Sequence, residues 1–174
     1  MERQPRAHVT IRRTEDIRDP DWLPLRCAFW DGESEEEHYA SLKKFTNTHA
    51  PYFAFIANDP DGRAVGFAEI SVRRDYVNGT HTSPVLYLEG IFVLPEYRGQ
   101  GISGALCDAA GQWGARHGFR EFASDSDVDN EVSIRAHLGL GFEETDRVVC
   151  FCKVIANPAA EDRRPADSEE HHGE

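Results

Sequence analysis

The sequence VLYLEGIFVLPEYRGQGISGAL, residues 85–106, decides the fold of this chain. Its first nine residues, 85–93, are predominantly apolar and predict a buried strand. A loop with Gly99, Gly101 and Gly104 follows, and a helix is expected to begin within it. Glycine lets the backbone turn tightly and approach a ligand closely, and the first N–H groups of a helix have no partners inside the helix. This order of elements therefore predicts a seat for a phosphate group.

The loop does not match two common phosphate-binding motifs. It lacks the Gly-x-x-x-x-Gly-Lys-Ser/Thr pattern of P-loop proteins, and no Gly-x-Gly-x-x-Gly on a first strand indicates a dinucleotide site. The segment Arg98-Gly99-Gln100-Gly101-Ile102-Ser103 instead resembles the Arg/Gln-x-x-Gly-x-Gly/Ala signature of the GCN5-related N-acetyltransferases (GNAT). The resemblance implies that this loop binds the pyrophosphate of acetyl-CoA. Ser103 departs from the signature, which prefers Gly or Ala at that position.

Composition and charge restrict the class of partner. A length of 174 residues with 40% hydrophobic residues is typical of one domain with its own core. The formal net charge of −12 argues against a nucleic-acid partner and favours a cationic small molecule or protein. No apolar run approaches the roughly 20 residues that a membrane helix needs, and no signal peptide is apparent, so we expect no membrane partner.

The four cysteines indicate a reducing compartment. Cys27, Cys107, Cys150 and Cys152 form no Cys-x-x-Cys pair, so neither a zinc site nor a redox motif is predicted. Cys150 and Cys152 lie two residues apart in an apolar run and would point to one face of a strand. We expect all four to be reduced and mostly buried in a cytoplasmic protein.

Hydrophobic periodicity and capping signals predict a mixed α/β (α+β) fold. Ser34 and Glu37 are expected to form a capping box, and Asp129 is expected to be the N-cap of a later helix. Strands are expected at 8–13, 54–57, 64–72, 85–93, 119–125 and 147–154, and helices at 22–30, from 34 onward, at 101–117 and at 129–140. This order suits a mixed sheet with helices on both faces. It also matches the GNAT fold, which implies a mostly antiparallel sheet with splayed central strands. We expect one domain at 8–155 and a disordered acidic tail at 156–174.

The second half of the chain narrows the resemblance to one family. Seven segments recur in the order and spacing of the aminoglycoside 6'-N-acetyltransferases, which are bacterial antibiotic-resistance enzymes; they are residues 76–80, 82–84, 88–95, 121–125, 129–130, 140–145 and 148–149. The match covers roughly residues 8–155 and is dense from Tyr76 onward. The resemblance implies acetyl-CoA as cosubstrate, a cationic aminoglycoside as acceptor and a homodimer.

The resemblance also implies which residues bind the coenzyme: Ile91, Phe92, Val93, Arg98, Gly99, Gln100, Gly101, Ile102, Ser103, Gly104, Asn130 and His137. Strand 85–93 would separate from its neighbour and offer backbone groups to the pantetheine arm. The Val93 N–H would face the thioester oxygen. His137 lies four residues before Gly141, where many relatives place a tyrosine that protonates the coenzyme thiolate, and a purely structural histidine is the alternative.

The acceptor site is implied in the same way. Glu89, Asp125 and Asp146 match acidic positions that bind the ammonium groups of the drug, and Trp30 and Tyr76 match aromatic residues that contact it. Asp146 stands where relatives often carry Glu, so its reach is shorter. The segment after Trp30 differs in length from the relatives, and no ligand is assigned within 31–38.

The chemistry of acetyl transfer requires the same residue types. An alkylammonium group with a pKa of about 9 to 10 is mostly charged at pH 7. It must lose a proton before the neutral amine can attack a thioester. Glu89 is the favoured base or water anchor and Asp125 the alternative, although either could serve as a counter-ion alone. The N–H of Val93 would stabilise the oxyanion. Asp125, Asp127 and Asp129 alternate, but no calcium-loop frame is complete, so no metal is predicted.

We therefore expect an aminoglycoside 6'-N-acetyltransferase that works by direct attack in a ternary complex, because no cysteine near the motif is an obvious covalent carrier. Two alternatives stay open. The first is an enzyme of the same fold that acetylates another amine, such as a polyamine or a protein N-terminus. The second is a module that binds acetyl-CoA as a sensor without turnover.

Overall fold

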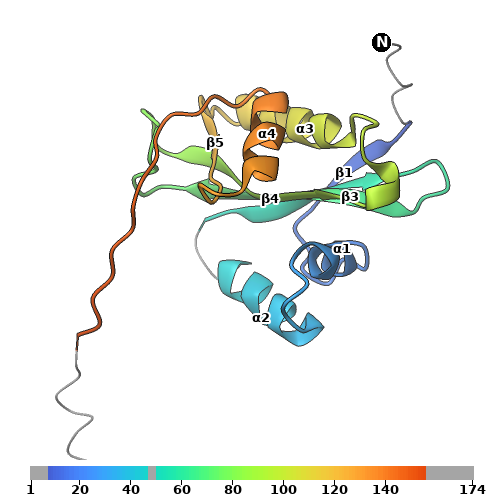
Figure 1. Cartoon of the computed structure of the whole chain (residues 1–174). Helices are drawn as coiled ribbons and strands as arrows, with labels where there is room; N and C mark the ends of the chain where they lie inside the picture. Colours follow the sequence, from blue (N-terminus) through green and yellow to red (C-terminus); the bar gives the residue numbers. More distant parts are fainter. Residues whose placement is uncertain (1–7, 47–49, 156–174) are drawn as a thin grey trace, which may run out of the picture.

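One five-stranded sheet separates two helical layers in the computed structural model, which describes residues 8–46 and 50–155 (Figure 1). The strands lie in the order β1-β2-β3-β4-β5, and every neighbouring pair is antiparallel except β4 and β5. Helices α1 and α2 cover one face, and α3 and α4 lie on the other. The elements are β1 (Thr10–Thr14), α1 (Trp22–Phe29), α2 (Glu35–Thr46), β2 (Tyr52–Asn58), β3 (Ala64–Arg73), β4 (Val85–Val93), the 3-10 helix η1 (Pro95–Tyr97), α3 (Ile102–Arg116), β5 (Phe122–Ser124) and α4 (Glu131–Gly139). The predicted fold class is confirmed.

Alternation along the strands builds a separate core on each face of the sheet. In β3, Ile70 and Val72 belong to the core that includes Leu106 of α3, whereas Phe67 belongs to the core that includes Trp22 and Leu42. Successive side chains of a strand point to opposite faces, so one strand supplies both cores. Both faces of β3 are therefore buried over most of its length.

The capping signals of the sequence explain where two helices begin. Ser34 and Glu37 form the predicted capping box, in which the Glu37 Oε2 accepts a hydrogen bond from the Ser34 N–H at 2.8 Å and Ser34 Oγ accepts from the Glu37 N–H at 3.3 Å. At α4 the N-cap is Asn130 rather than the expected Asp129, because the Asn130 Oδ1 accepts from the Ser133 N–H at 3.0 Å.

The predicted last strand at 147–154 is wrong for the single chain. This segment is extended but pairs with no strand among the residues described, and it stands away from the body (Figure 1). A strand needs a neighbour to satisfy its backbone groups, and none is offered here. Cys150 and Cys152 are therefore exposed, contrary to the expectation, whereas Cys107 is buried and Cys27 is partly buried.

The predicted tail at 156–174 lies outside the described residues. Within the two described ranges, no helix combines the length and the apolar character that a membrane crossing requires.

A buried ion pair ties α1 to the sheet. Glu69 of β3 has no exposed surface, and its carboxylate lies 3.1 Å from Nε of Arg26 in α1. The same carboxylate accepts hydrogen bonds from Trp22 Nε1 at 2.7 Å and from the Tyr52 hydroxyl at 2.5 Å. Burial raises the pKa of Glu69, while the Arg26 charge and the two hydrogen bonds oppose that shift.

Replacing Arg26 with Met should lower the free energy of unfolding by about 3–5 kcal/mol, because the Glu69 carboxylate would stay buried without its counter-charge. Urea denaturation followed by tryptophan fluorescence measures the change. The double variant Arg26→Met/Glu69→Gln should recover a large part of the loss, since a neutral amide keeps hydrogen-bonding atoms for Trp22 and Tyr52. A loss below about 1 kcal/mol in the single variant would contradict this account.

Candidate functional site

The site is organised by the point at which β4 and β5 separate. The two strands pair in parallel from Leu86 to Leu88, where Leu88 lies opposite Ser124, and β5 ends there while β4 continues to Val93. The register between β3 and β4 shifts at the same point, so Glu89 is an extra residue in the ladder. Because of this extra residue, each N–H and C=O group of β4 after Glu89 points to the opposite side from the one that it would have in a regular strand.

Two hydrogen bonds indicate which way those groups point. The Leu94 N–H donates to the Val65 carbonyl of the β3 side at 2.9 Å. Because N–H groups alternate along an extended strand, those of Ile91 and Val93 point away from β3, into the gap left by β5. The Val93 carbonyl also faces away from β3, where it accepts a hydrogen bond from Arg98 Nε at 3.0 Å. The gap is therefore edged by N–H groups of β4 that pair with no strand among the described residues, as the splayed sheet predicts.

The glycine-rich loop lies between this gap and α3. Gly99 and Gly101 have φ values of 75° and 81°, a left-handed conformation that favours glycine. No side chain of the described residues caps the N-terminus of α3. Its first N–H groups are thus available to an anion, and the positive end of the helix dipole favours one. The Arg98 side chain binds the Val93 carbonyl, so it braces the loop against β4.

Two carboxylates follow directly after the last β4–β5 pair. Glu89 comes next after Leu88 on β4, and Asp125 comes next after Ser124 on β5. Both lie on the face of the sheet covered by α1 and α2, since Tyr87 and Ala123, two residues earlier, pack together there with Val77. The fold therefore brings together residues that are 36 positions apart in the sequence.

An arginine and a tyrosine bind these carboxylates. Arg73, the last residue of β3, donates from Nε and Nη2 to Glu89 at 3.1 and 2.8 Å, and the Ser71 hydroxyl also donates to Glu89. The Arg73 guanidinium stacks on the Tyr87 ring, with Cζ 3.3 Å from its centroid. Burial lowers the pKa of Arg73, but its hydrogen bond to Glu89 and the charges of Glu89, Tyr87 and Asp125 raise that pKa overall. Burial raises the pKa of Tyr87, and a hydrogen bond to Asp125 raises it further.

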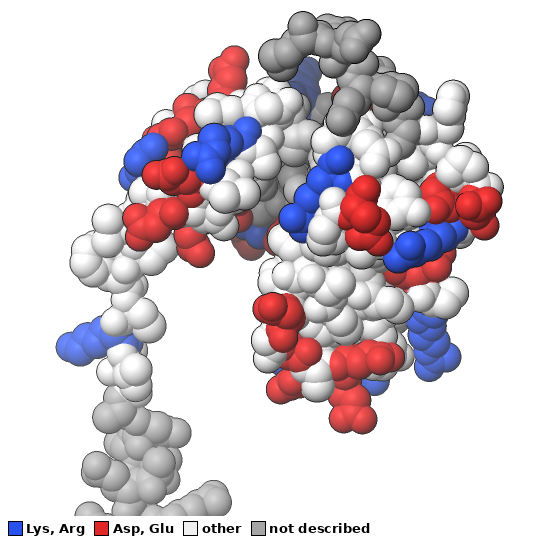
Figure 2. Space-filling view, turned by 45° about the vertical axis from the view of Figure 1, so that its right-hand side comes forward, with Lys and Arg blue, Asp and Glu red and all other residues white. Residues whose placement is uncertain are grey.

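A cavity of about 850 Å³ opens beside this cluster. It lies between the loop after β3, strand β5, helix α4 and the start of the extended segment, residues 142–150. Its lining includes seven carboxylates, which come from α3, from the residues on either side of β5 and from the extended segment, against two arginines, Arg73 and Arg147. In Figure 2, red side chains, with some blue ones among them, lie where the extended segment leaves the body. The cavity has the charge that attracts a polycation.

The predicted acceptor residues divide into two groups. Tyr76, Asp125 and Asp146 line the cavity, and Tyr76 is 83% exposed. Glu89 and Trp30 do not line the cavity. Glu89 is bound by Arg73, which does line it, and Trp30, the residue after α1, lies against Gly90 of β4. The structure thus brings Glu89 and Asp125 to one strand junction, while Trp30 approaches that junction from the helical layer.

The two remaining coenzyme candidates sit on α4. Asn130 is occupied as the N-cap of the helix. His137 places Nε2 2.9 Å from Ser124 Oγ and Nδ1 2.8 Å from the Ser133 carbonyl, and Ser124 Oγ in turn donates to the Leu88 carbonyl at 3.0 Å. The histidine therefore braces α4 against the last pair of β4 and β5. This geometry suits the structural alternative and leaves the imidazole next to the strand gap.

Sequence reasoning missed Arg73, Ser71 and Tyr87. The sequence offers a weak signal for Tyr87, which lies two residues before Glu89 and therefore on the same face of a strand. Arg73 carries no such signal, because its contact with Glu89 depends on the register of two strands and on the bulge between them. Only the pairing shows that a cation faces the candidate base.

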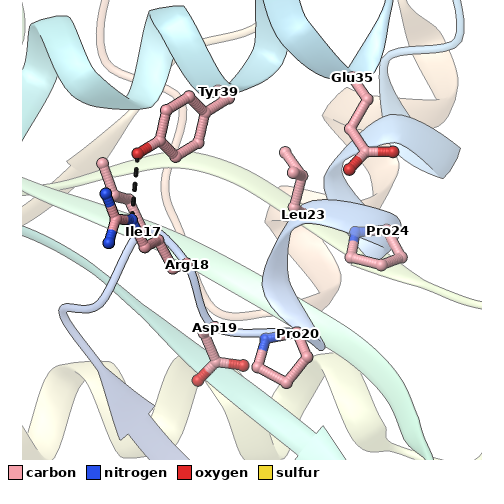
Figure 3. Close-up of a pocket in the computed structure, with 8 residues that line it drawn as sticks. All are labelled: Ile17, Arg18, Asp19, Pro20, Leu23, Pro24, Glu35 and Tyr39. Atoms are coloured by element: carbon pink, nitrogen blue, oxygen red, sulfur yellow. Dashed lines mark hydrogen bonds between the residues drawn. The ribbon is translucent and has the colours of Figure 1, made fainter.

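A second, smaller hollow lies between α1 and α2 and has a volume of about 280 Å³ (Figure 3). Arg18 Nε donates to the Tyr39 hydroxyl across it at 3.4 Å, and Asp19, Glu35 and Leu23 complete much of its wall. It contains none of the residues that the sequence predicts for the site. Across the described ranges, no group of three or more His, Cys, Asp and Glu side chains is arranged to bind a metal ion.

The chain matches known proteins over most of its length. A family model described as "Acetyltransferase (GNAT) family" matches residues 14–142. Aminoglycoside N(6')-acetyltransferase type 1 of Salmonella enteritidis is 41% identical over 145 residues, which cover 83% of this chain and 99% of the relative. The protein of the same name from Acinetobacter baumannii is 44% identical over 135 residues, covering 78% of this chain and 91% of the relative.

Solved structures agree with these relatives. AAC(6')-Iy, in complex with the bisubstrate analog CoA-S-monomethyl-acetylneamine, has a TM-score of 0.76 and 41% identity, covering 86% of this chain and all of that one (100%). The aminoglycoside 6'-N-acetyltransferase AAC(6')-Ih from Acinetobacter baumannii has a TM-score of 0.77 and 40% identity, covering 85% of this chain and 99% of that one.

Substituting Gly90 with Ala should displace the Trp30 ring, because the added Cβ would lie 2.7 Å from its Cη2 atom and 3.0 Å from Phe29. We expect a stability loss of about 1–3 kcal/mol and a changed tryptophan emission, both measured during urea denaturation. Gly111→Ala is the matched control, since nothing lies within 4 Å of its added Cβ in the middle of α3. The control should be stabilising by about 0.5–1 kcal/mol, and an equal effect in the two variants would contradict the packing described.

Proposed function

The chain belongs to the GNAT acetyltransferase family and, within it, to the aminoglycoside 6'-N-acetyltransferases, and on that basis we propose that it acetylates the 6'-amine of aminoglycosides with acetyl-CoA. One structural observation carries the proposal further. Glu89 and Asp125 directly follow the last β4–β5 pair, so carboxylates adjoin a gap edged by strand backbone. The acetyl group of a coenzyme bound in that gap would therefore lie next to an amine of a substrate bound at those carboxylates.

The donor side of the site follows from the backbone. The pantetheine arm would pair with the groups of Ile91, Phe92 and Val93 that point away from β3. The pyrophosphate would bind the N–H groups of residues 98–104, where two left-handed glycines and the uncapped start of α3 lie. The N–H of Val93 would then donate to the thioester oxygen and stabilise the negative charge that develops there.

The acceptor side supplies charge and a proton acceptor. Ammonium groups of the drug would bind Glu89, Asp125 and Asp146, with Tyr76 and Trp30 packing against its rings. Glu89 would accept the proton of the attacking amine, directly or through water, and Asp125 is the alternative base. The neutral amine then attacks the acetyl carbonyl directly, and the coenzyme leaves as the thiolate.

We propose that this reaction takes place in the cytoplasm, where a reducing environment suits four free cysteines. The acidic cavity supports a cationic small-molecule acceptor over a nucleic acid, whose phosphates it would repel.

We propose further that the chain forms a homodimer through the extended segment at 147–155. Phe151, Val154 and Ile155 of this segment are 92%, 89% and 87% exposed, and the outer edge of β5 has no strand partner among the residues described. An unpaired edge and an exposed, extended apolar segment are complementary features. A second copy of the chain would supply each with the partner that it lacks.

The activity is tested by incubating the protein with acetyl-CoA and kanamycin or tobramycin and measuring the released thiol. Glu89→Gln should reduce kcat/KM for the drug by about 10²-fold or more, because general-base catalysis is typically worth 10²–10⁴-fold. Asp125→Asn should raise KM for the drug. The KM for acetyl-CoA should stay unchanged in both.

Two outcomes would contradict these assignments. Absence of turnover with every 6'-amino aminoglycoside would reject the proposed acceptor, and transfer to polyamines or peptides would then identify the alternative enzyme. Calorimetric binding of acetyl-CoA without transfer to any amine would instead support a sensor. Full activity in both variants would reject the carboxylate assignment while leaving the activity intact.

The dimer is tested by sedimentation velocity of the full chain. Phe151→Asp should shift the species toward the monomer, because a buried apolar contact would have to accept a charge. Arg135→Gln, an exposed change on α4 that removes only an i,i+4 ion pair, is the control and should sediment like the parent. A parent chain that is monomeric at micromolar concentration would refute the assembly.

A further inference from the structure

Arg73 binds Glu89, the carboxylate that is proposed to bind an ammonium group of the acceptor. Its Nε and Nη2 atoms bind the two oxygens of Glu89 at 3.1 and 2.8 Å, in a bidentate arrangement. Its guanidinium stacks on the Tyr87 ring, and the charge of Asp125 acts on both Arg73 and Tyr87. One side chain thus faces both carboxylates of the strand junction.

The ion pair of Arg73 and Glu89 is more exposed to solvent than the buried, structural pair of Arg26 and Glu69. The Arg73 side chain is 40% exposed and Glu89 is 20% exposed, whereas the buried pair of Arg26 and Glu69 is 8% and 0% exposed. Arg73 also lines the acidic cavity. Water can replace its contacts when it turns away, so its displacement costs far less than that of Arg26.

Two arginines line the cavity among the described residues, and they have different partners. Arg147 binds Glu144 at 2.6 and 3.2 Å, whereas Arg73 binds Glu89. Glu89 already accepts hydrogen bonds from Ser71 and twice from Arg73. A substrate ammonium that approached Glu89 would therefore meet a like charge at contact distance, and two such cations repel each other.

We propose that Arg73 is an internal competitor of the cationic acceptor: its guanidinium occupies Glu89 in the empty site, and an ammonium group of the substrate displaces it. This inference rests on the proposed function. It adds a specificity-determining residue to it, because displacement favours acceptors whose other ammonium groups bind the remaining carboxylates of the cavity. An amine with a single charge gains no such contacts and would displace Arg73 poorly.

The opposite role, in which Arg73 orients Glu89 for catalysis, makes different kinetic demands. An orienting residue affects kcat, and its loss leaves KM unchanged or higher. An internal competitor affects the binding of the acceptor, and its loss lowers KM and the dissociation constant while kcat changes little.

The first experiment compares Arg73→Gln with the parent in steady-state kinetics and in calorimetry with kanamycin. We expect KM and the dissociation constant for the drug to fall about 3- to 10-fold, with KM for acetyl-CoA unchanged and kcat within about twofold. Arg13→Gln removes the same charge from β1 at the far edge of the sheet, where Arg13 pairs with the exposed Glu15, and should behave like the parent. An unchanged or raised KM in Arg73→Gln would overturn the inference.

The second experiment restores the competitor from solution. In Arg73→Ala, added ethylguanidinium should raise the apparent KM for kanamycin toward the value of the parent, more than sodium chloride does at equal ionic strength. The parent should respond equally to the two salts. An equal response in the variant would overturn the inference. Arg73→Lys retains the charge without the bidentate contact and gives an intermediate KM, which covers the case in which the Gln or Ala variant folds poorly.

The two hypotheses fail in different ways. If the parent acetylates kanamycin and Arg73→Gln binds it no more tightly, the role of Arg73 is rejected and the proposed function stands. If the parent neither binds nor acetylates any aminoglycoside, the proposed function is rejected and the inference falls with it.

Discussion

The extra residue at Glu89 is the constraint on which the site depends. By shifting the β3–β4 register at the position where β5 ends, it turns the following N–H groups of β4 into the gap between β4 and β5. The Glu89 carboxylate itself lies on the face opposite Leu88, next to Ser71 and Arg73. A regular ladder would direct the N–H of Val93 back to β3, where it could not reach a ligand in the gap.

Different groups around this junction suit the two proposed substrates. The strand gap, the left-handed glycines and the free N-terminus of α3 offer neutral backbone donors, which suit a phosphate-bearing thioester. The side chains at the other end of the junction are carboxylates, which suit a polycation. Arg26, Glu69 and His137 hold the elements that carry these groups, and each makes more than one hydrogen bond or ion contact. Fixed side chains such as those of Glu69 and His137 thus support the partly exposed residues Glu89 and Arg73.

The sequence predicted well wherever a signal was local. The strand at 85–93, the capping box of Ser34 and Glu37 and the helix after the glycine loop all depend on neighbouring residues, and each was found as expected. The last strand at 147–154 was wrong, because its apolar run forms a strand only beside a partner strand, and the described residues offer none. The exposed Cys150 and Cys152 share that cause.

The sequence by itself determined the order of the elements as far as α4, the glycine-rich loop and the acidic character of the candidate site, since motifs and charge are properties of the chain. It also supplied Glu89 and Asp125, through the resemblance. Tertiary structure alone decided that these two residues follow the same strand pair, and that Arg73 occupies one of them. The reason is physical: a contact across a sheet depends on register, and a single extra residue changes every partner that follows it.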